Sequence, residues 1–165
     1  MTSLRRLLLP CLTLAIVLLP AATPSARAQD SSYIRIPNAT AEMEEAKAKA
    51  RATLPQFWAK LEKPGADEDS FGLKVALPYG GNSTEHIWTK NIERNDGKIF
   101  GVINNRPRDV KTVRLGQRIE IGESQISDWM YTRSGKIVGN FTLRPMLSKM
   151  PPEDAARYRA TLAEP

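Results

Sequence analysis

His86 is the only histidine in this chain of 165 residues, and its side chain is the one best suited to proton transfer near neutral pH. With Asp128 or Glu85 as a carboxylate partner, it could serve as the base of a hydrolase or transferase. Glu85 and His86 are adjacent, however, and in a regular strand they point to opposite faces. A nucleophilic Ser127 or Ser134 lacks the signature of a nucleophile elbow. We therefore interpret His86 as a structural or ligand-contacting residue and assign no catalytic residue.

Metal ligands are scarce in this sequence. Zinc is bound mainly by histidine and cysteine side chains, and the chain has one residue of each type. The acidic run Asp67-Glu68-Asp69 lacks the ligand spacing of a calcium loop, and we interpret it as a solvated acidic loop. The sequence therefore predicts neither a metal site nor a cofactor.

Aromatic residues give the stronger functional signal. Trp129 and Tyr131 share one face of a predicted strand, and Asp128 points to the other. Such aromatics either fill the core or line a groove for a peptide or glycan, while Asp128 either anchors that ligand or holds a strand end through backbone hydrogen bonds. Our preferred hypothesis is a small, non-catalytic binding module with an aromatic and polar face. Its candidate ligand-binding residues are His86, Trp88, Asp128, Trp129, Tyr131 and Asn140.

The segment 106–118 is basic, with a local net charge of +4. A loop of this charge can contact an acidic envelope protein or an anionic envelope polymer, or it can simply be solvated. It would also be the contact surface if the protein were an inhibitor or immunity-like partner of another protein. Nucleic acid is a poor fit, because no binding motif accompanies the charge. The five basic residues are Arg106, Arg108, Lys111, Arg114 and Arg118.

The first 28 residues have the organisation of a cleaved secretory signal peptide. Arg5 and Arg6 precede an apolar run over 7–19, and Ala26-Arg27-Ala28 places small residues where a signal peptidase reads them. The apolar run is too short for a membrane-spanning helix, which needs roughly 20 residues. We expect cleavage after Ala28 and a periplasmic or secreted mature protein without a membrane span.

Cleavage would change the chemistry of the chain. Cys11, the only cysteine, lies within the apolar run and lacks the small preceding residues of a lipidation site, so the mature protein would contain no thiol. Removing three arginines lowers the formal charge from +6 to +3. The mature chain is therefore only modestly basic.

Periodicity predicts an N-terminal helix that begins near Thr40. Apolar residues recur at spacings of three and four on one face, namely Met43, Ala46, Ala50, Leu54, Phe57 and Leu61. Pro55 interrupts this pattern, so the helix either kinks or stops and restarts. We favour a restart with Thr53 as the N-cap of a second helix.

After a loop over 63–69 the period changes to two, which predicts strands over 71–77, 84–92, 98–104 and 118–121. Residues 126–142 form two apolar runs around an Arg-Ser-Gly-Lys turn, which predicts a hairpin. A helix is expected from Pro151 to about Leu162. The fold class is therefore α+β: an N-terminal helix or kinked helix pair, a mainly antiparallel sheet of about five to six short strands, and a C-terminal helix. We expect an arm over 29–40 and a single domain over 41–165.

Five ordered motifs suggest a family. They are Thr-Glu-His-Ile-Trp at 84–88, Gly-Val-Ile-Asn-Asn-Arg-Pro at 101–107, Gly-Gln at 116–117, Ile-Ser-Asp-Trp-Met-Tyr at 126–131 and Gly-Asn-Phe-Thr at 139–142. The chain resembles the YegJ-like bacterial family of domains of unknown function (number 2314) over about residues 41–150. This resemblance implies a bacterial origin, and hence a periplasmic or secreted destination, but no particular reaction, cofactor or catalytic residue.

Overall fold

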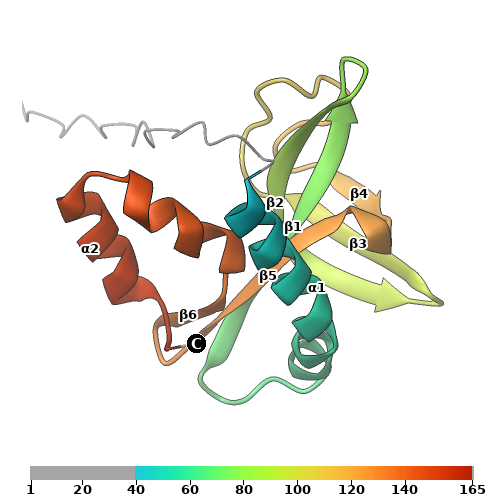
Figure 1. The fold of residues 1–165 in the computed structure, drawn as a ribbon. Helices are drawn as coiled ribbons and strands as arrows, with labels where there is room; N and C mark the ends of the chain where they lie inside the picture. The colour runs from blue at the N-terminus through green and yellow to red at the C-terminus, as the bar shows by residue number, and fades with distance from the viewer. Residues whose placement is uncertain (1–39, 165) are drawn as a thin grey trace, which may run out of the picture. The chain divides into compact units, whose positions relative to one another are not determined.

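The structure is a computed structural model that describes residues 40–164 (Figure 1). The predicted signal peptide and all of the predicted arm except Thr40 lie outside the described residues. A long helix comes first, six strands and a short 3₁₀ helix follow, and a 3₁₀ segment and a final helix end the described chain. The predicted α+β class is confirmed: along the chain, a helix precedes the strands of an antiparallel sheet and another helix follows them.

The first helix, α1, spans Ala41–Glu62. Thr40 is its N-cap, because its Oγ1 accepts a hydrogen bond of 3.2 Å from the backbone N–H of Met43. The side chains that α1 buries follow the predicted period of three to four residues, and burial against the rest of the domain therefore stabilises the helix along its length. These buried residues are Met43, Lys47, Ala50, Leu54 and Phe57.

Pro55 lies inside α1, and the predicted restart at Thr53 is wrong. The Thr53 hydroxyl donates back to the carbonyl of Lys49 at 2.8 Å, with Ala50 O at 3.2 Å, instead of capping a new helix. Pro55 is exposed, so its missing N–H and ring fall on the solvent side of the helix. Leu54 and Phe57, buried on either side of it in sequence, keep the helix continuous against the sheet.

The six strands form one sheet in the order β4-β3-β2-β1-β5-β6, and every neighbouring pair is antiparallel. Each strand overlaps a predicted one. β1 begins at Glu68, however, so part of the predicted acidic loop is strand. The bounds are β1 Glu68–Tyr79, β2 Ser83–Asn95, β3 Lys98–Ile103, β4 Arg118–Ile121, β5 Ile126–Arg133 and β6 Lys136–Gly139.

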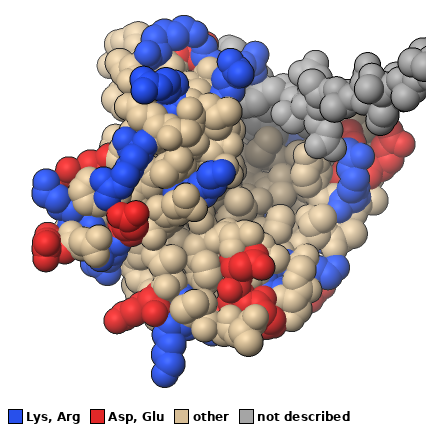
Figure 2. All heavy atoms as spheres, turned by 180° about the vertical axis from the view of Figure 1, so that it is seen from behind, with Lys and Arg blue, Asp and Glu red and all other residues tan. Residues whose placement is uncertain are grey.

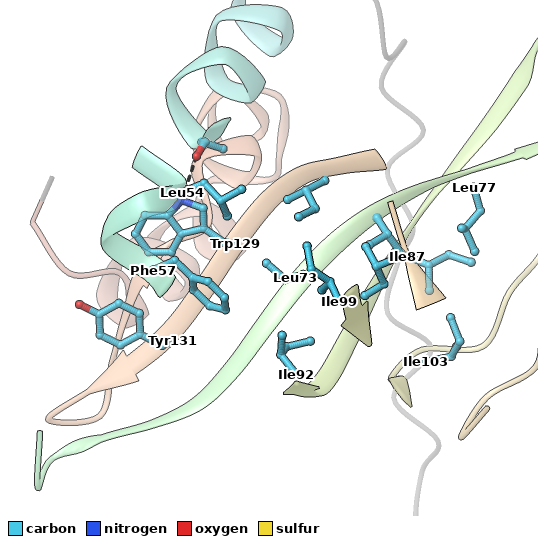
Figure 3. Packing of buried hydrophobic residues seen from close by; sticks show 14 of the residues in the cluster. Leu54, Phe57, Leu73, Leu77, Ile87, Ile92, Ile99, Ile103, Trp129 and Tyr131 are labelled. Carbon is cyan, nitrogen blue, oxygen red and sulfur yellow. Dashed lines mark hydrogen bonds between the residues drawn. The ribbon is translucent and has the colours of Figure 1, made fainter. Parts of the chain in front are cut away.

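One face of the sheet carries the hydrophobic core. Leu73 and Val75 of β1 pair with Thr89 and Ile87 of β2, and all four side chains are buried. In Figure 3, Leu73 and Ile87 lie between the side chains of α1 and Ile103. The alternation predicted for 71–77 and 84–92 thus corresponds to real burial, and the opposite face carries less buried residues that include Lys74, His86 and Lys90.

A group of aromatic rings joins α1 to β5 within this core. The ring of Trp129 lies 5.7 Å from that of Phe57 and nearly parallel to that of Tyr131, at 8° and 6.0 Å. The indole N–H of Trp129 donates to the carbonyl of Ala50 at 3.0 Å (Figure 3). A buried indole needs such a partner, and here the helix backbone provides it.

The chain after β6 differs from the prediction. β6 ends at Gly139, so the predicted hairpin is shorter than 126–142, and Phe141 belongs to a 3₁₀ segment, η2, over Phe141–Lys149. Asn140 precedes η2 in a left-handed conformation with φ of 49°. The last helix, α2, spans Pro152–Thr161, close to its predicted range. A shorter 3₁₀ helix, η1, occupies Glu123–Gln125.

A substitution at Gly139, the last residue of β6, can test the packing of the chain against Trp129. Gly139 has φ of +83°, and a Cβ at this position would overlap Trp129, with the ring carbon Cε3 at 2.7 Å. We expect Gly139→Ala to lower the free energy of unfolding by about 3 kcal/mol or more, because backbone strain and steric overlap add.

Gly135 provides the matched control, because it also has a positive φ, +74°, but no atom within 4 Å of the added Cβ. Gly135→Ala is expected to cost only about 1 kcal/mol. Urea unfolding of both variants measures the difference, and equal costs would contradict the proposed overlap with Trp129.

Candidate functional site

The carboxylate of Asp128 lies fully buried and accepts hydrogen bonds from a neighbouring turn. Its Oδ2 accepts from the backbone N–H of Thr142 at 2.8 Å and from the hydroxyl of Thr142 at 2.6 Å. Its Oδ1 accepts from the N–H groups of Trp129 at 2.8 Å and Phe141 at 3.1 Å. Burial raises the pKa of Asp128, although these donors and Lys74 act in the opposite direction. Asp128 therefore holds the end of the hairpin through backbone hydrogen bonds, which was one of the two roles considered for it from the sequence.

Lys74 extends this polar group on the face of the sheet opposite the core. Its ammonium donates to the hydroxyl of Thr142 at 2.8 Å and lies 5.1 Å from the ring centre of Trp88. Burial lowers the pKa of Lys74, which Asp128 partly restores. The lysine thus contributes a nearby positive charge to a buried carboxylate without a direct ion pair.

His86 contacts a serine and not a carboxylate. Its Nδ1 lies 2.8 Å from Oγ of Ser127, and the Ser127 hydroxyl donates to the carbonyl of Lys74 at 3.0 Å. With its proton directed to that carbonyl, the hydroxyl accepts from Nδ1–H and is not activated as a nucleophile. Burial, followed by the charges of Lys47 and Lys74, lowers the pKa of His86 to about 4. The imidazole is therefore neutral at pH 7.

Glu85 points to the core side of β2, and its neighbour His86 points to the other side, as expected for adjacent residues of a strand. Its carboxylate accepts three backbone N–H bonds of 2.8–2.9 Å, from Arg108, Asp109 and Val110. The pKa of Glu85 is lowered because these bonds, together with Lys111, outweigh burial. Glu85 fixes the basic segment to the sheet and is not placed for acid–base catalysis with His86.

The predicted aromatic and polar face is not a single surface. Trp129 and Tyr131 are buried in the core, at 3% and 4% exposure, and Asn140 is buried at the turn before η2. Trp88 is half-buried, and its register opposite Lys74 places it on the other face of the sheet from Trp129. A ligand therefore cannot lie across all of these rings at once.

A hollow of about 560 Å³ lies between the C-terminal half of α1 and strands β5 and β6. Its apolar lining includes Ala59, Val138 and the small accessible parts of Trp129 and Tyr131. Its polar lining is Gln56, Lys60, Lys63 and Arg133. This volume is within the range of about 300–1,000 Å³ that is typical of small-molecule sites.

The carboxylate of Glu68 forms ion pairs with two of the cationic residues that line the hollow. Its Oε1 lies 2.8 Å from Nε of Arg133 and 3.1 Å from Nζ of Lys60, and its Oε2 accepts from the N–H of Gly65 at 2.9 Å. The bond from Gly65, together with Lys60 and Arg133, lowers the pKa of Glu68 to about 2. The interpretation of Glu68 as part of a solvated acidic loop is therefore wrong.

Sequence analysis did not identify this cationic group. Lys60 and Lys63 lie at the end of α1, and Arg133 lies at the end of β5, so 70 residues separate Lys63 from Arg133. The local pattern shows only that Tyr131 and Arg133, two residues apart in a strand, share one face. It does not show that the end of α1 lies nearby.

The predicted basic segment is partly occupied by internal contacts. Arg118 forms an ion pair of 2.8 Å with Glu93 and lies 3.8 Å from the ring centre of Phe100. Lys111 donates to the carbonyl of Arg108. Arg106 and Arg114 are exposed. In Figure 2, basic and acidic side chains are interspersed on the face shown, with uncharged residues between them.

Residues 40–164 contain no cluster of three or more His, Cys, Asp or Glu side chains arranged to hold a metal ion. Within the same range, no helix is long and apolar enough to cross a membrane.

Together, the fold and the hollow define a small α+β protein in which one helix packs on a six-stranded antiparallel sheet. The chain belongs to the bacterial family described as "Uncharacterized protein conserved in bacteria (DUF2314)", whose sequence profile matches residues 40–163. The resemblance drawn from the five motifs is thereby confirmed.

Two curated proteins are similar to this chain. Uncharacterized protein YegJ of Escherichia coli (strain K12) is 39% identical over 113 residues, which cover 68% of this chain and 72% of that protein. A protein of Neisseria meningitidis serogroup B named "Putative ankyrin repeat protein NMB1133/NMB1171" is 28% identical over 138 residues, covering 79% of this chain and 54% of that protein. No solved structure matches significantly.

The pKa of His86 gives a prediction about stability. In the unfolded chain the imidazole binds a proton near pH 6.5, whereas in the folded protein it does so near pH 4. The unfolded state therefore takes up the proton first, and stability falls as the pH is lowered through this window. Between pH 7 and pH 5 we expect His86 to account for a loss on the order of 1–2 kcal/mol.

The non-titrating variant His86→Gln isolates this effect, because Asp128 and Glu68 remain in both proteins. Denaturant unfolding at pH 7 and pH 5 should show a smaller loss in the variant than in the unmodified chain. An identical loss in both proteins would show that His86 protonation does not destabilise the fold.

Proposed function

We propose that this protein is an exported, non-catalytic binding module whose ligand occupies the hollow between α1 and the β5–β6 hairpin. The observation that carries the proposal is an apolar hollow of about 560 Å³ bordered by cationic side chains from two separate elements. Small-molecule sites combine these two features, an apolar interior and a few polar groups that orient the ligand.

The positions of the candidate acid–base residues favour binding over catalysis. His86 bonds to Ser127, Asp128 bonds to the turn at Thr142, and Glu85 bonds to the backbone of the basic segment. A general base needs a reachable proton and an orienting partner, and each of these groups is committed to a structural contact instead. The alternative of a hydrolase or transferase that uses His86 with either carboxylate therefore has less support.

Export is supported by the order of features in residues 1–28, where two arginines precede an apolar run and an Ala-x-Ala site. A mature domain without cysteine needs no disulfide to fold outside the cytoplasm, since a chain of this size can bury enough apolar surface. A periplasmic or secreted binding module is thus consistent with the sequence of the mature chain.

The hollow can be tested by blocking it. Ala59 is exposed and lines the hollow, so Ala59→Trp should fill it without removing any core contact. Fragment compounds are screened against the ¹⁵N-labelled protein by NMR. We expect bound fragments to shift the amide signals of Ala59 and Tyr131, and Ala59→Trp to weaken their binding at least tenfold.

Ala48→Trp is the matched control, because Ala48 is also exposed on α1 and lies roughly 16 Å away along the helix axis, at 1.5 Å per residue. This variant should bind the fragments as the unmodified chain does. Fragments that bind but shift only signals away from the hollow would refute the proposed site.

Export can be tested by expressing the full chain in Escherichia coli and measuring the mass of the product in the periplasmic fraction. Cleavage after Ala28 should yield a chain that begins at Gln29. Ala28→Arg should block cleavage, because signal peptidase requires a small residue there. A product that retains Met1 and remains in the cytoplasmic fraction would contradict the proposal.

A further inference from the structure

We propose that the ligand of the hollow carries an anionic group, a carboxylate or a phosphate, on a small apolar body. Arg133 and Lys63 would bind the anionic group, and the apolar interior would bind the body. This inference rests on the proposed binding function and specifies the chemical class of its ligand.

The lining of the hollow has one sign of charge. Lys60, Lys63 and Arg133 all line it, and no carboxylate is among its lining residues. Lysines near a helix C-terminus can be explained by the helix dipole, which favours cations there. Arg133 lies at the end of β5, however, and the dipole of α1 does not account for its position.

Arg133 is held in one orientation with donors to spare. Its Nε donates to Glu68 at 2.8 Å and its Nη2 donates to the hydroxyl of Tyr131 at 2.5 Å. A guanidinium has five N–H donors, so three of them remain for another acceptor. The side chain is 46% exposed, so these contacts leave about half of it open to solvent. A guanidinium fixed in this way is suited to a carboxylate or phosphate, because little side-chain entropy is lost on binding.

The two lysines have different roles. Lys60 is engaged in its ion pair with Glu68, whereas within residues 40–164 no carboxylate lies within ion-pair distance of Lys63. Lys63 is also exposed, at the C-cap of α1. Glu68 thus neutralises part of the charge of Lys60 and Arg133, while Lys63 adds an uncompensated charge at the same hollow.

The aromatic residues at the hollow belong to a stack that also contacts Arg133. Tyr131 lies nearly parallel to Phe71, at 17° and 5.1 Å, and to Trp129. Trp129 and Tyr131 are only 3% and 4% exposed, so only small parts of these side chains reach the hollow. The guanidinium of Arg133 lies 5.4 Å from the ring centre of Tyr131, so this aromatic stack also helps to hold the cationic side chain.

The experiment compares three probes that share one apolar body: 2-naphthoate, 2-naphthyl phosphate and the neutral 2-naphthalenemethanol. Each is titrated into the ¹⁵N-labelled mature protein, and binding is followed by NMR. We expect both anions, or one of them, to bind at least tenfold more tightly than the alcohol. The order of the two anions identifies a carboxylate or a phosphate as the preferred group.

Two variants test the named cations. Lys63→Gln removes an exposed charge without breaking an ion pair of the described chain, and it should weaken anion binding about threefold to tenfold while leaving the alcohol unaffected. Arg133→Gln should have a larger effect on the anions, and its folding is checked by its urea midpoint. Lys90→Gln is the control, because it removes an exposed positive charge from β2, outside the hollow, and should change neither affinity.

The outcomes separate this inference from the function on which it rests. If the alcohol shifts signals at the hollow and binds as tightly as the anions, the binding site stands and the preference for an anion is overturned. If Lys63→Gln and Lys90→Gln weaken anion binding equally, the effect is one of general charge and the assigned contact is overturned. If none of the probes shifts signals at the hollow, both the inference and the proposed function fail.

Discussion

The arrangement of the C-terminal third of this protein depends on burying the carboxylate of Asp128. A buried carboxylate costs several kcal/mol unless hydrogen bonds and a nearby charge replace its water. Here the backbone N–H groups of Trp129, Phe141 and Thr142, together with one hydroxyl, provide those bonds. The requirement fixes where the chain turns after β6, and hence where η2 begins. It also fixes β5, whose Trp129 and Tyr131 form one wall of the hollow.

Glu68, the first residue of β1, has a comparable role at the C-terminal end of β5. It connects the start of β1 to the end of α1 through Lys60 and to the end of β5 through Arg133. Three elements therefore meet at one carboxylate, and one of them, β5, is distant in sequence from the other two. The hollow lies beside this junction, so its cationic residues are positioned by the same contacts that hold the fold together. Lys60 and Arg133 therefore both stabilise the fold through Glu68 and line the hollow.

Much of the fold could be predicted because burial in this chain follows simple periods. The alternation in 71–77 and 84–92 matches the buried residues of β1 and β2, and the spacing from Met43 to Phe57 matches the buried stripe of α1. The prediction for Pro55 failed because local rules do not include the packing of Leu54 and Phe57, which keeps the helix continuous. The 3₁₀ segment η2 was missed because its position is set by Asp128, a contact across 14 residues.

The candidate site was harder to predict. Types and spacing indicated that Trp129, Tyr131 and Asp128 were important, but not which of them point inward. The hollow depends on the end of α1 lying beside the end of β5, which no local pattern specifies. Glu68 was assigned to a solvated loop because acidic runs are usually solvated. It is buried instead, because it pairs with Lys60 of α1 and Arg133 of β5, and a local pattern does not show these partners. Tertiary contacts of this kind are visible only in the structure.

The residues after α2 return to the sheet. Leu162 forms a parallel bridge with Ile137 of β6, and the N–H of Ala163 donates to the carbonyl of Ile137 at 2.8 Å. β6 is the last strand on its side of the sheet, so this segment occupies hydrogen-bonding groups that an edge strand would otherwise present to other molecules. The outer edge of the sheet is thus partly capped by the chain itself at β6. Strand-to-strand association between molecules, including the first step of aggregation, is accordingly disfavoured at that edge.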